Sequence, residues 1–414
     1  MTSDEKNQER KGRAVLKWAY VAVGLVINIL LGTIYSWSVF RNPLQGTLGW
    51  NQFESSLPFT FFLFMFAILM PVGGRLIEKI GPRRTAILGG ALVGSGWILG
   101  GVLPSMGPSL LMMVLTYGII GGAGVGIIYG VPIAVSSRWV PERRGLAVGL
   151  TVMGFGLSPL ITAPVARYVI NSSGVLNTFL YLGLVFFAAL VFLSMLMVFP
   201  GKQVSAGAGV ASASGMKPGE MLRTGTFYGV WLAYVLGTMG GFIAISLSSQ
   251  YGENVVGLDS SMAAAATSLF AVFNGIGRPA FGSLCDKAGV RIGAVVSFVL
   301  ILIASLTATQ SSTLPLYLLS FAILWFTFGG WLAIAPTATA GFFGLRNQSM
   351  NYGIVFTAYG AGALIGPSVA GYIYQATGAY HLAFITTAIM SVSGMLVSAL
   401  LLKPVKTVKR EVSR

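Results

Sequence analysis

The sequence is poor in the side chains that most catalytic and metal sites require. Its 414 residues include one cysteine, Cys285, and one histidine, His381. An internal disulfide is therefore excluded, and a metal site built from several histidines or cysteines cannot be assembled. A serine nucleophile would also lack a neighbouring histidine base. We therefore expect no enzyme, no metal and no cofactor.

Charged residues are also scarce. They make up 9% of the chain, whereas soluble domains contain about 25%. Hydrophobic residues make up 55%, and the mean hydropathy is +0.80. None of the 11 acidic residues falls in the middle of a long apolar segment, which excludes a carboxylate pair inside a membrane. The 55 glycines let membrane helices pack closely, so the composition is typical of a multi-pass α-helical membrane protein.

The basic residues are confined to particular segments. The formal net charge is +15, but apart from Arg41, Arg167 and Arg278 every lysine and arginine lies in a tail or in alternate loops. This asymmetry follows the positive-inside rule of membrane proteins. We therefore expect membrane lipid, rather than nucleic acid, as the partner of these residues, and both termini in the cytoplasm.

Twelve apolar segments are long enough to cross a bilayer as helices, since hydrocarbon about 30 Å thick needs about 20 residues. The stretch 200–226 is rich in glycine, alanine and serine, which indicates a flexible cytoplasmic linker. We predict an all-α membrane protein with two six-helix bundles, 16–199 and 227–402, and cytoplasmic tails at 1–15 and 403–414. The predicted spans are 16–40, 53–76, 85–104, 109–137, 144–170, 175–199, 227–252, 261–284, 292–310, 314–343, 350–375 and 382–402.

The two bundles repeat one another at an offset of 208 residues, which predicts pseudo-symmetric halves. Duplicated six-helix halves are typical of transporters that rock one bundle against the other around a midplane site. We expect the repeated loops to act in gating, with their acids accepting hydrogen bonds from basic side chains or helix N-termini; for the basic residues, control of membrane topology is the alternative. The matching loop residues are Gly74, Glu78, Gly81 and Arg83 after the second span, and Gly282, Asp286, Gly289 and Arg291 after the eighth.

Arg278 interrupts an apolar segment. It lies eight residues before Asp286, which places its Cα about 12 Å deep at 1.5 Å per residue. An arginine keeps its charge, so at that depth it faces a cavity or a partner, or extends to the headgroups. Asn274 lies four residues earlier, on the same helix face. A guanidinium offers a carboxylate two parallel hydrogen bonds, and Asn274 offers one more. One buried cation without a buried acid favours a monoanion.

Aromatic residues form a second group of candidates, and packing or anchoring at the membrane interface is the alternative for each of them. Four tyrosines lie in spans one, four and eleven, which line the cavity in this architecture. Together with Phe356 we expect them to line the substrate site. These tyrosines are Tyr35, Tyr117, Tyr129 and Tyr359.

Five motifs carry a resemblance to a known family. They resemble the bacterial oxalate/formate antiporters, which belong to the monocarboxylate porter group of the major facilitator superfamily, and also the monocarboxylate transporters that move lactate or pyruvate with a proton. The motifs are TIYSWSVFRNPL (33–44), GAGVGIIYGVPIAVSSRWVPERRGLAVGL (122–150), GEMLRTGTFYGVW (219–231), FNGIGRPAFGSLCDKAG (273–289) and NYGIVFTAYGAGAL (351–364).

The resemblance implies the major facilitator fold, a bacterial inner membrane location and a substrate-binding role for Arg278. It also implies that Tyr35 and Tyr129 are pocket residues, whereas Tyr359 stands where oxalate carriers have a second cation, a lysine. Asn274 replaces an aspartate of the animal monocarboxylate transporters.

With one cation in the site, we predict proton symport of a monocarboxylate such as lactate or pyruvate, by a chain that is monomeric by default. Carboxylate exchange of the oxalate:formate type is the alternative. A receptor role would need a signalling domain, which the short tails do not supply.

Overall fold

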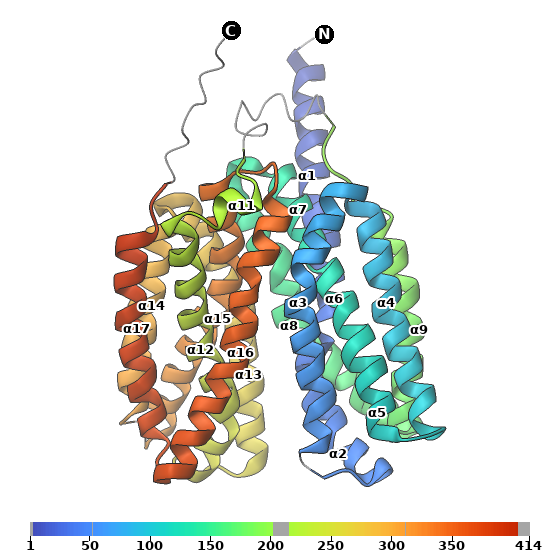
Figure 1. Ribbon diagram of the computed structural model, residues 1–414, viewed down its shortest axis with the longest axis vertical. Coiled ribbons are helices and arrows are strands. Elements are labelled where there is room, and N and C mark those ends of the chain that lie inside the picture. Colours follow the sequence, from blue (N-terminus) through green and yellow to red (C-terminus); the bar gives the residue numbers. More distant parts are fainter. Residues whose placement is uncertain (1–2, 52, 202–214, 311, 405–414) are drawn as a thin grey trace.

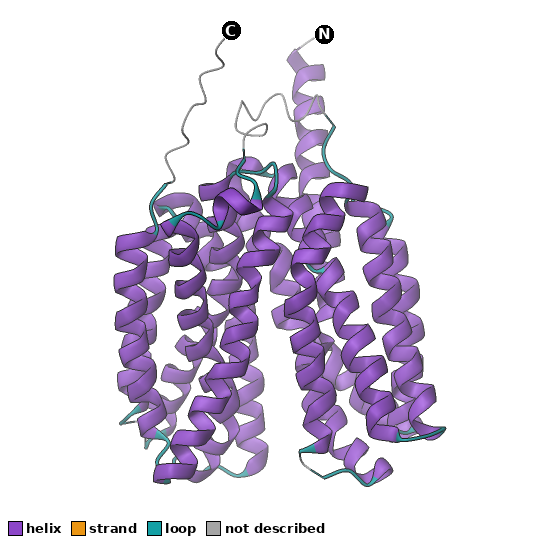
Figure 2. Cartoon of the chain, in the orientation of Figure 1, coloured by secondary structure: helices purple, strands orange, loops and turns teal. Residues whose placement is uncertain are grey.

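The computed structural model describes residues 3–51, 53–201, 215–310 and 312–404, which form helices joined by loops (Figure 2). Eleven helical segments in these ranges are long and apolar enough to cross a membrane. They are Leu16–Leu48, Glu54–Ile80, Pro82–Ser105, Ser109–Trp139, Pro141–Ser173, Val175–Ser194, Gly225–Asn254, Val290–Ala308, Leu314–Phe343, Gln348–Thr377 and His381–Leu401.

The N-terminal half contains six of these segments, some of which consist of several consecutive helices. Its longer helices are α1 (Ser3–Leu31), α2 (Trp37–Leu48), α3 (Leu57–Ile80), α4 (Pro82–Val102), α6 (Gly122–Ile128), α7 (Gly130–Trp139), α8 (Arg144–Ser173) and α9 (Val175–Ser194). Between them lie the 3-10 turn η1 (Gly32–Ser36), the short helix α5 (Ser109–Met113) and the π-helical segment η4 (Val114–Gly121).

The C-terminal half contains the short helix α11 (Pro218–Met221) and six long helices. These are α12 (Gly225–Asn254), α13 (Ser260–Ala288), α14 (Val290–Ala308), α15 (Leu314–Phe343), α16 (Gln348–Thr377) and α17 (His381–Leu401). α13 is not among the eleven apolar segments, although it has 29 residues. Small residues, Asn274 and Arg278 lower its hydropathy, and it packs between α8 and α15. With α13, each half has six spans.

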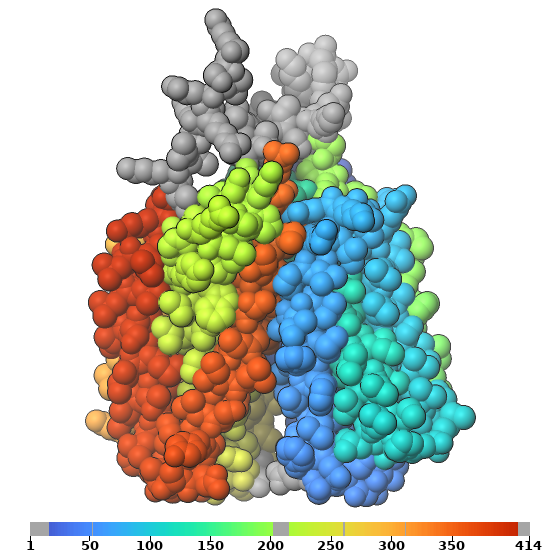
Figure 3. Space-filling view, viewed as in Figure 1, coloured from blue at the N-terminus to red at the C-terminus, as the bar shows by residue number. Residues whose placement is uncertain are grey.

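The two halves lie side by side and meet along α8 with α13 and along α3 with α16 (Figure 1). The contact is tightest near the side on which α1 begins and α17 ends, here called the termini side. There the backbones of Gly145 and Gly282 touch, and Gly74 lies against Met350. Toward the opposite side, the far side, the halves separate (Figure 3). The molecule is therefore closed on the termini side.

Both predicted tails and the linker differ from, or lie outside, what the structure describes. Helix α1 begins at Ser3, so the predicted tail 1–15 is helical from that residue. Residues 202–214 of the predicted linker and 405–414 of the predicted C-terminal tail lie outside the described residues. The described part of the linker contains α11 and the first residues of α12.

Candidate functional site

Arg278 lies in α13 at the boundary between the two halves. Its Nη1 donates to the Val152 carbonyl of α8 at 2.5 Å, and its Nε and Nη2 donate to Asn274 Oδ1 at 3.3 and 3.2 Å. Among the side chains that the structure describes, Arg278 is the one charged group that is fully buried. The guanidinium is thus turned into the protein and does not extend to the lipid headgroups, which was the alternative interpretation.

A cluster of aromatic rings of the N-terminal half lies beside this guanidinium. The Phe155 ring centroid lies 5.9 Å from Arg278 Cζ, and the Phe155 ring meets the rings of Tyr35 and Tyr129 edge to face, at 5.1 and 5.3 Å. Phe66 of α3 packs against Phe155 at 5.9 Å. Because the walls are apolar and the guanidinium is fully buried, an anion bound here would be attracted strongly.

Two tyrosine hydroxyls connect the halves beside this cluster. The hydroxyl of Tyr35 in η1 and that of Tyr359 in α16 lie 2.7 Å apart, within hydrogen-bond distance. Phe356 stacks on Tyr359 with a centroid separation of 4.8 Å and also contacts Tyr129. The structure therefore brings together six of the seven predicted substrate residues, from η1, the junction of α6 and α7, α13 and α16.

The seventh, Tyr117, contacts other rings than those of this cluster, and its role in substrate binding stays a prediction. Its ring lies in the core of the N-terminal half, where it contacts Trp37, Phe62, Trp97 and Phe179 at centroid separations of 4.8 to 5.4 Å. Tyr117 belongs to the π-helical segment η4, whose wider turns change which residues face the bundle interior. The sequence gives no sign of this change in helix type.

The two duplicated acids occupy equivalent positions at the termini side. Asp286 accepts hydrogen bonds from the backbone N–H groups of Gly145 and Leu146, at 2.7 and 2.8 Å, in the first turn of α8. Glu78 accepts one from the Met350 N–H, at 3.2 Å, in the first turn of α16. Each acid thus satisfies free N–H groups at the start of a helix in the opposite half, where the helix dipole also favours a negative charge.

The basic residues of the same loops do not take part in these contacts across the interface. Arg291 donates to the Ala399 carbonyl of α17, in its own half, and Arg83 is exposed. Two other polar contacts join the halves on this side. Ser137 donates to Gln348 Oε1 at 3.0 Å, and Arg138 donates to the Leu345 carbonyl at 3.1 Å.

Several residues of the site were not predicted from the sequence. Phe66 touches Phe155, Phe356 and Tyr359, yet it lies in a phenylalanine-rich run with nothing to distinguish it. Val152 takes part through its backbone carbonyl, which no side-chain pattern reveals. Gly156, one turn after Val152 in α8, leaves room for the guanidinium, because a Cβ at this position would lie 3.0 Å from Arg278 Nε.

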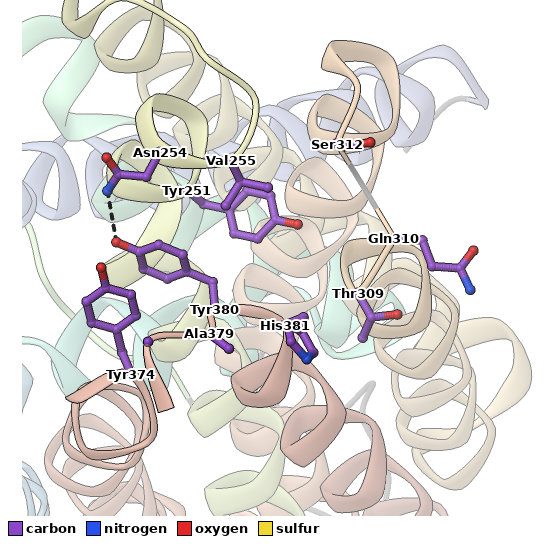
Figure 4. A pocket seen from close by; sticks show the side chains of 11 residues that line it. Tyr251, Asn254, Val255, Thr309, Gln310, Ser312, Tyr374, Ala379, Tyr380 and His381 are labelled. Carbon is purple, nitrogen blue, oxygen red and sulfur yellow. Dashed lines mark hydrogen bonds between the residues drawn. The ribbon is translucent and has the colours of Figure 1, made fainter. Parts of the chain in front are cut away.

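The structure also has a cavity of about 490 Å³ (Figure 4). Its lining residues lie at the ends of α12, α14 and α16 and at the start of α17, on the far side of the C-terminal half. It is lined by neutral groups such as Asn254, Gln310 and Tyr380, together with His381, which is exposed. Asn254 donates to the Tyr380 hydroxyl at 2.9 Å. Because this cavity lies within one half rather than between the two, we do not assign the transport site to it.

Comparison with known sequences gives a consistent result. The profile of the Major Facilitator Superfamily matches residues 19–266 and 230–414, nearly the whole chain. The oxalate:formate antiporter of Oxalobacter formigenes is 30% identical over 91% of this chain and 89% of its own. Monocarboxylate transporter 13 of Rattus norvegicus is 27% identical over 79% of this chain and 76% of its own.

Solved structures share the fold. The E. coli fucose:proton symporter FucP is 15% identical, with a TM-score of 0.72 over 92% of this chain and 97% of that one. The proton:xylose symporter XylE is 14% identical, with a TM-score of 0.71 over 94% and 97%. These similarities agree with two six-helix bundles. The family profile and the 30% identical relative establish that this chain belongs to the Major Facilitator Superfamily and is a membrane transporter rather than an enzyme.

Proposed function

We propose that the chain carries small carboxylates by alternating access and that Arg278 binds the carboxylate. The observation that carries this proposal is a fully buried guanidinium, at the interface of the two halves, without an ion-pair partner among the described acidic side chains. Burial of a permanent cation is costly, so such a residue is retained where an anion neutralises it during the transport cycle.

The present contacts of Arg278 indicate how a carboxylate would enter. Val152 belongs to the N-terminal half, whereas Asn274 belongs to the same helix as Arg278. When the halves move apart, the bond to the Val152 carbonyl is lost and that to Asn274 is kept. A carboxylate then replaces the carbonyl as acceptor on Nη1, and charged partners make stronger hydrogen bonds than neutral ones.

The surroundings of Arg278 favour a substrate with a single negative charge and a small apolar end. Arg278 is one cation, and the hydroxyls of Tyr35 and Tyr359 beside it are neutral. Phe66, Phe155 and Phe356 supply the apolar walls. The resemblance to oxalate carriers places Tyr359 where those proteins have a lysine, which supports a monocarboxylate over a dicarboxylate.

For coupling, carboxylate exchange is the mode that the comparisons support best. The relative that is 30% identical is named an oxalate:formate antiporter, and it covers more of the chain than monocarboxylate transporter 13 does. Proton symport, which was preferred from the sequence, is the second candidate. It is supported by the similarity to monocarboxylate transporters and by the single cation, which suits a lactate or pyruvate monoanion.

The basic loops support a position in a bacterial inner membrane with the termini side in the cytoplasm. The junction of α3 with α4 and the end of α13 lie on that side together with the start of α1 (Figure 1), and these segments carry Arg84 and Lys287.

The experiment is uptake of labelled lactate, formate and oxalate into proteoliposomes loaded with unlabelled carboxylate or with buffer alone. Exchange predicts uptake that requires internal carboxylate and ignores an imposed pH gradient. Proton symport predicts uptake into empty vesicles that follows the pH gradient. If none of these carboxylates enters under either condition, the proposed function is wrong.

A further inference from the structure

Two tyrosine hydroxyls of the C-terminal half converge on the termini side of Arg278. Tyr234 of α12 and Tyr352 of α16 are 0% and 2% exposed, and their phenol groups lie close enough to act on each other electrostatically. Each hydroxyl has the other as its hydrogen-bonding neighbour, and neither has a partner among the other described groups. Both rings pack around Phe356, at centroid separations of 6.3 and 5.8 Å.

The pair lies between Arg278 and the termini side. Tyr352 precedes Tyr359 by seven residues, which is nearly two helical turns, so both side chains point from the same face of α16 about 10 Å apart along its axis. Gln348 lies one turn further on that face, at the first residue of the helix. Its Nε2 is also buried without a described partner. Neutral donors therefore continue from the level of Arg278 to the end of α16.

All of these groups belong to one half of the molecule. Arg278, Tyr234, Tyr352 and Gln348 come from α13, α12 and α16, and they stay together when the C-terminal half moves as a unit. The N-terminal half covers them in the present conformation, where Tyr129 packs on Phe356 and Ser137 bonds to Gln348. Opening of the termini side removes this cover and exposes the hydroxyls to the aqueous path.

We propose that Tyr234 and Tyr352 form an inner station that binds the substrate carboxylate after it leaves Arg278; the inference rests on the proposed function. Buried polar groups are almost always hydrogen-bonded. Two phenols that have only each other share one hydrogen bond, so one O–H is left to donate to a partner that is present in another state. Phenolic O–H groups donate to a carboxylate without adding a second permanent charge. The station therefore holds the anion more weakly than Arg278 does and lets it pass to the cytoplasm.

The test compares Tyr352→Phe and Tyr234→Phe with Tyr317→Phe as the matched control. Tyr317 is a buried tyrosine of the same half, but its hydroxyl already donates to the Ser248 carbonyl at 2.8 Å. Carboxylate KM is measured from each side, with inside-out and right-side-out membrane vesicles. We expect Tyr352→Phe and Tyr234→Phe to raise KM from the cytoplasmic side about 3- to 10-fold, the loss of one hydrogen bond, and to leave KM from the far side unchanged.

Tyr317→Phe should change neither KM and should lower the unfolding temperature, because it leaves the Ser248 carbonyl without its donor. If Tyr352→Phe and Tyr234→Phe stay folded and change the two KM values equally, or change neither, the inner station is wrong while the proposed function stands. Absence of carboxylate transport by the unmodified protein would instead defeat the proposed function itself.

Discussion

The hydroxyls of Tyr35 and Tyr359 lie 2.7 Å apart and join the two halves of the transporter beside its one fully buried described cation, Arg278. Tyr35 belongs to a 3-10 turn between α1 and α2, whereas Tyr359 lies within the long helix α16. Since any movement of one half against the other changes this distance, the hydrogen bond belongs to the present conformation. It contributes to that conformation and is lost in others.

Replacement of either tyrosine by phenylalanine should remove this bond and leave the other hydroxyl buried. We expect Tyr35→Phe and Tyr359→Phe each to lower the free energy of unfolding, and the double variant to lose less than the sum. The coupling should be about 1 kcal/mol. Unfolding of the four proteins in detergent measures it. Tyr168, which is 76% exposed, supplies a control substitution without effect; strictly additive losses would show that the two hydroxyls do not interact.

Gly145 should not tolerate even a methyl group. A Cβ at this position overlaps the Gly282 carbonyl of the opposite half, so Gly145→Ala forces α8 and α13 apart on the termini side. Overpacking of this kind costs about 1 to 3 kcal/mol, and we expect at least a tenfold fall in transport rate. Gly341→Ala is the matched control, since nothing lies within 4 Å of a Cβ there. Equal rates for the two variants would mean that close contact of α8 with α13 is not needed.

The two acids of the repeated loops should differ in how much they stabilise contact between the halves on the termini side. Asp286 accepts two backbone hydrogen bonds at 2.7 and 2.8 Å, and Glu78 accepts one at 3.2 Å. Asp286→Asn removes the charge and should therefore lower the free energy that holds the halves together on the termini side by about 1.5 to 3 kcal/mol. Glu78→Gln should lower it by less. Hydrogen exchange of the Gly145 and Leu146 amides measures this.

We expect those amides to exchange faster in Asp286→Asn, whereas Glu78→Gln should act on the first turn of α16 instead. The exposed Arg83, changed to Gln, serves as the control and should affect neither. Unchanged exchange at both helix starts would argue against a role for the acids in closure.

Much of the fold was predictable from the sequence because lipid imposes long apolar helices, and because the 208-residue repeat divides them into two sets. The contact of Arg278 with Asn274 was also predictable, since residues four apart share a helix face. Both follow from the types and spacing of residues along the chain. They need no knowledge of how helices are arranged around each other.

The rest of the site depends on packing between helices. The Val152 carbonyl contacts Arg278 because α8 packs at the interface. Phe66 contacts the aromatic wall at Phe155 because α3 packs there too. Tyr117 was predicted as a site residue because of its span, and its ring packs against Trp37 and Phe179 in the N-terminal half. Nothing in a local pattern of residues reports these orientations.

The most direct test of the account is carboxylate counterflow by Arg278→Gln and Arg278→Lys in proteoliposomes. Glutamine keeps donors but removes the charge, and lysine keeps the charge but cannot offer two parallel donors. We predict that Arg278→Gln loses transport by about 100-fold or more, since a charged hydrogen bond and its ion pairing are both lost, and that Arg278→Lys retains a small fraction. A folded Arg278→Gln protein that exchanges carboxylates at the unmodified rate would contradict the assignment of Arg278 as the anion-binding residue.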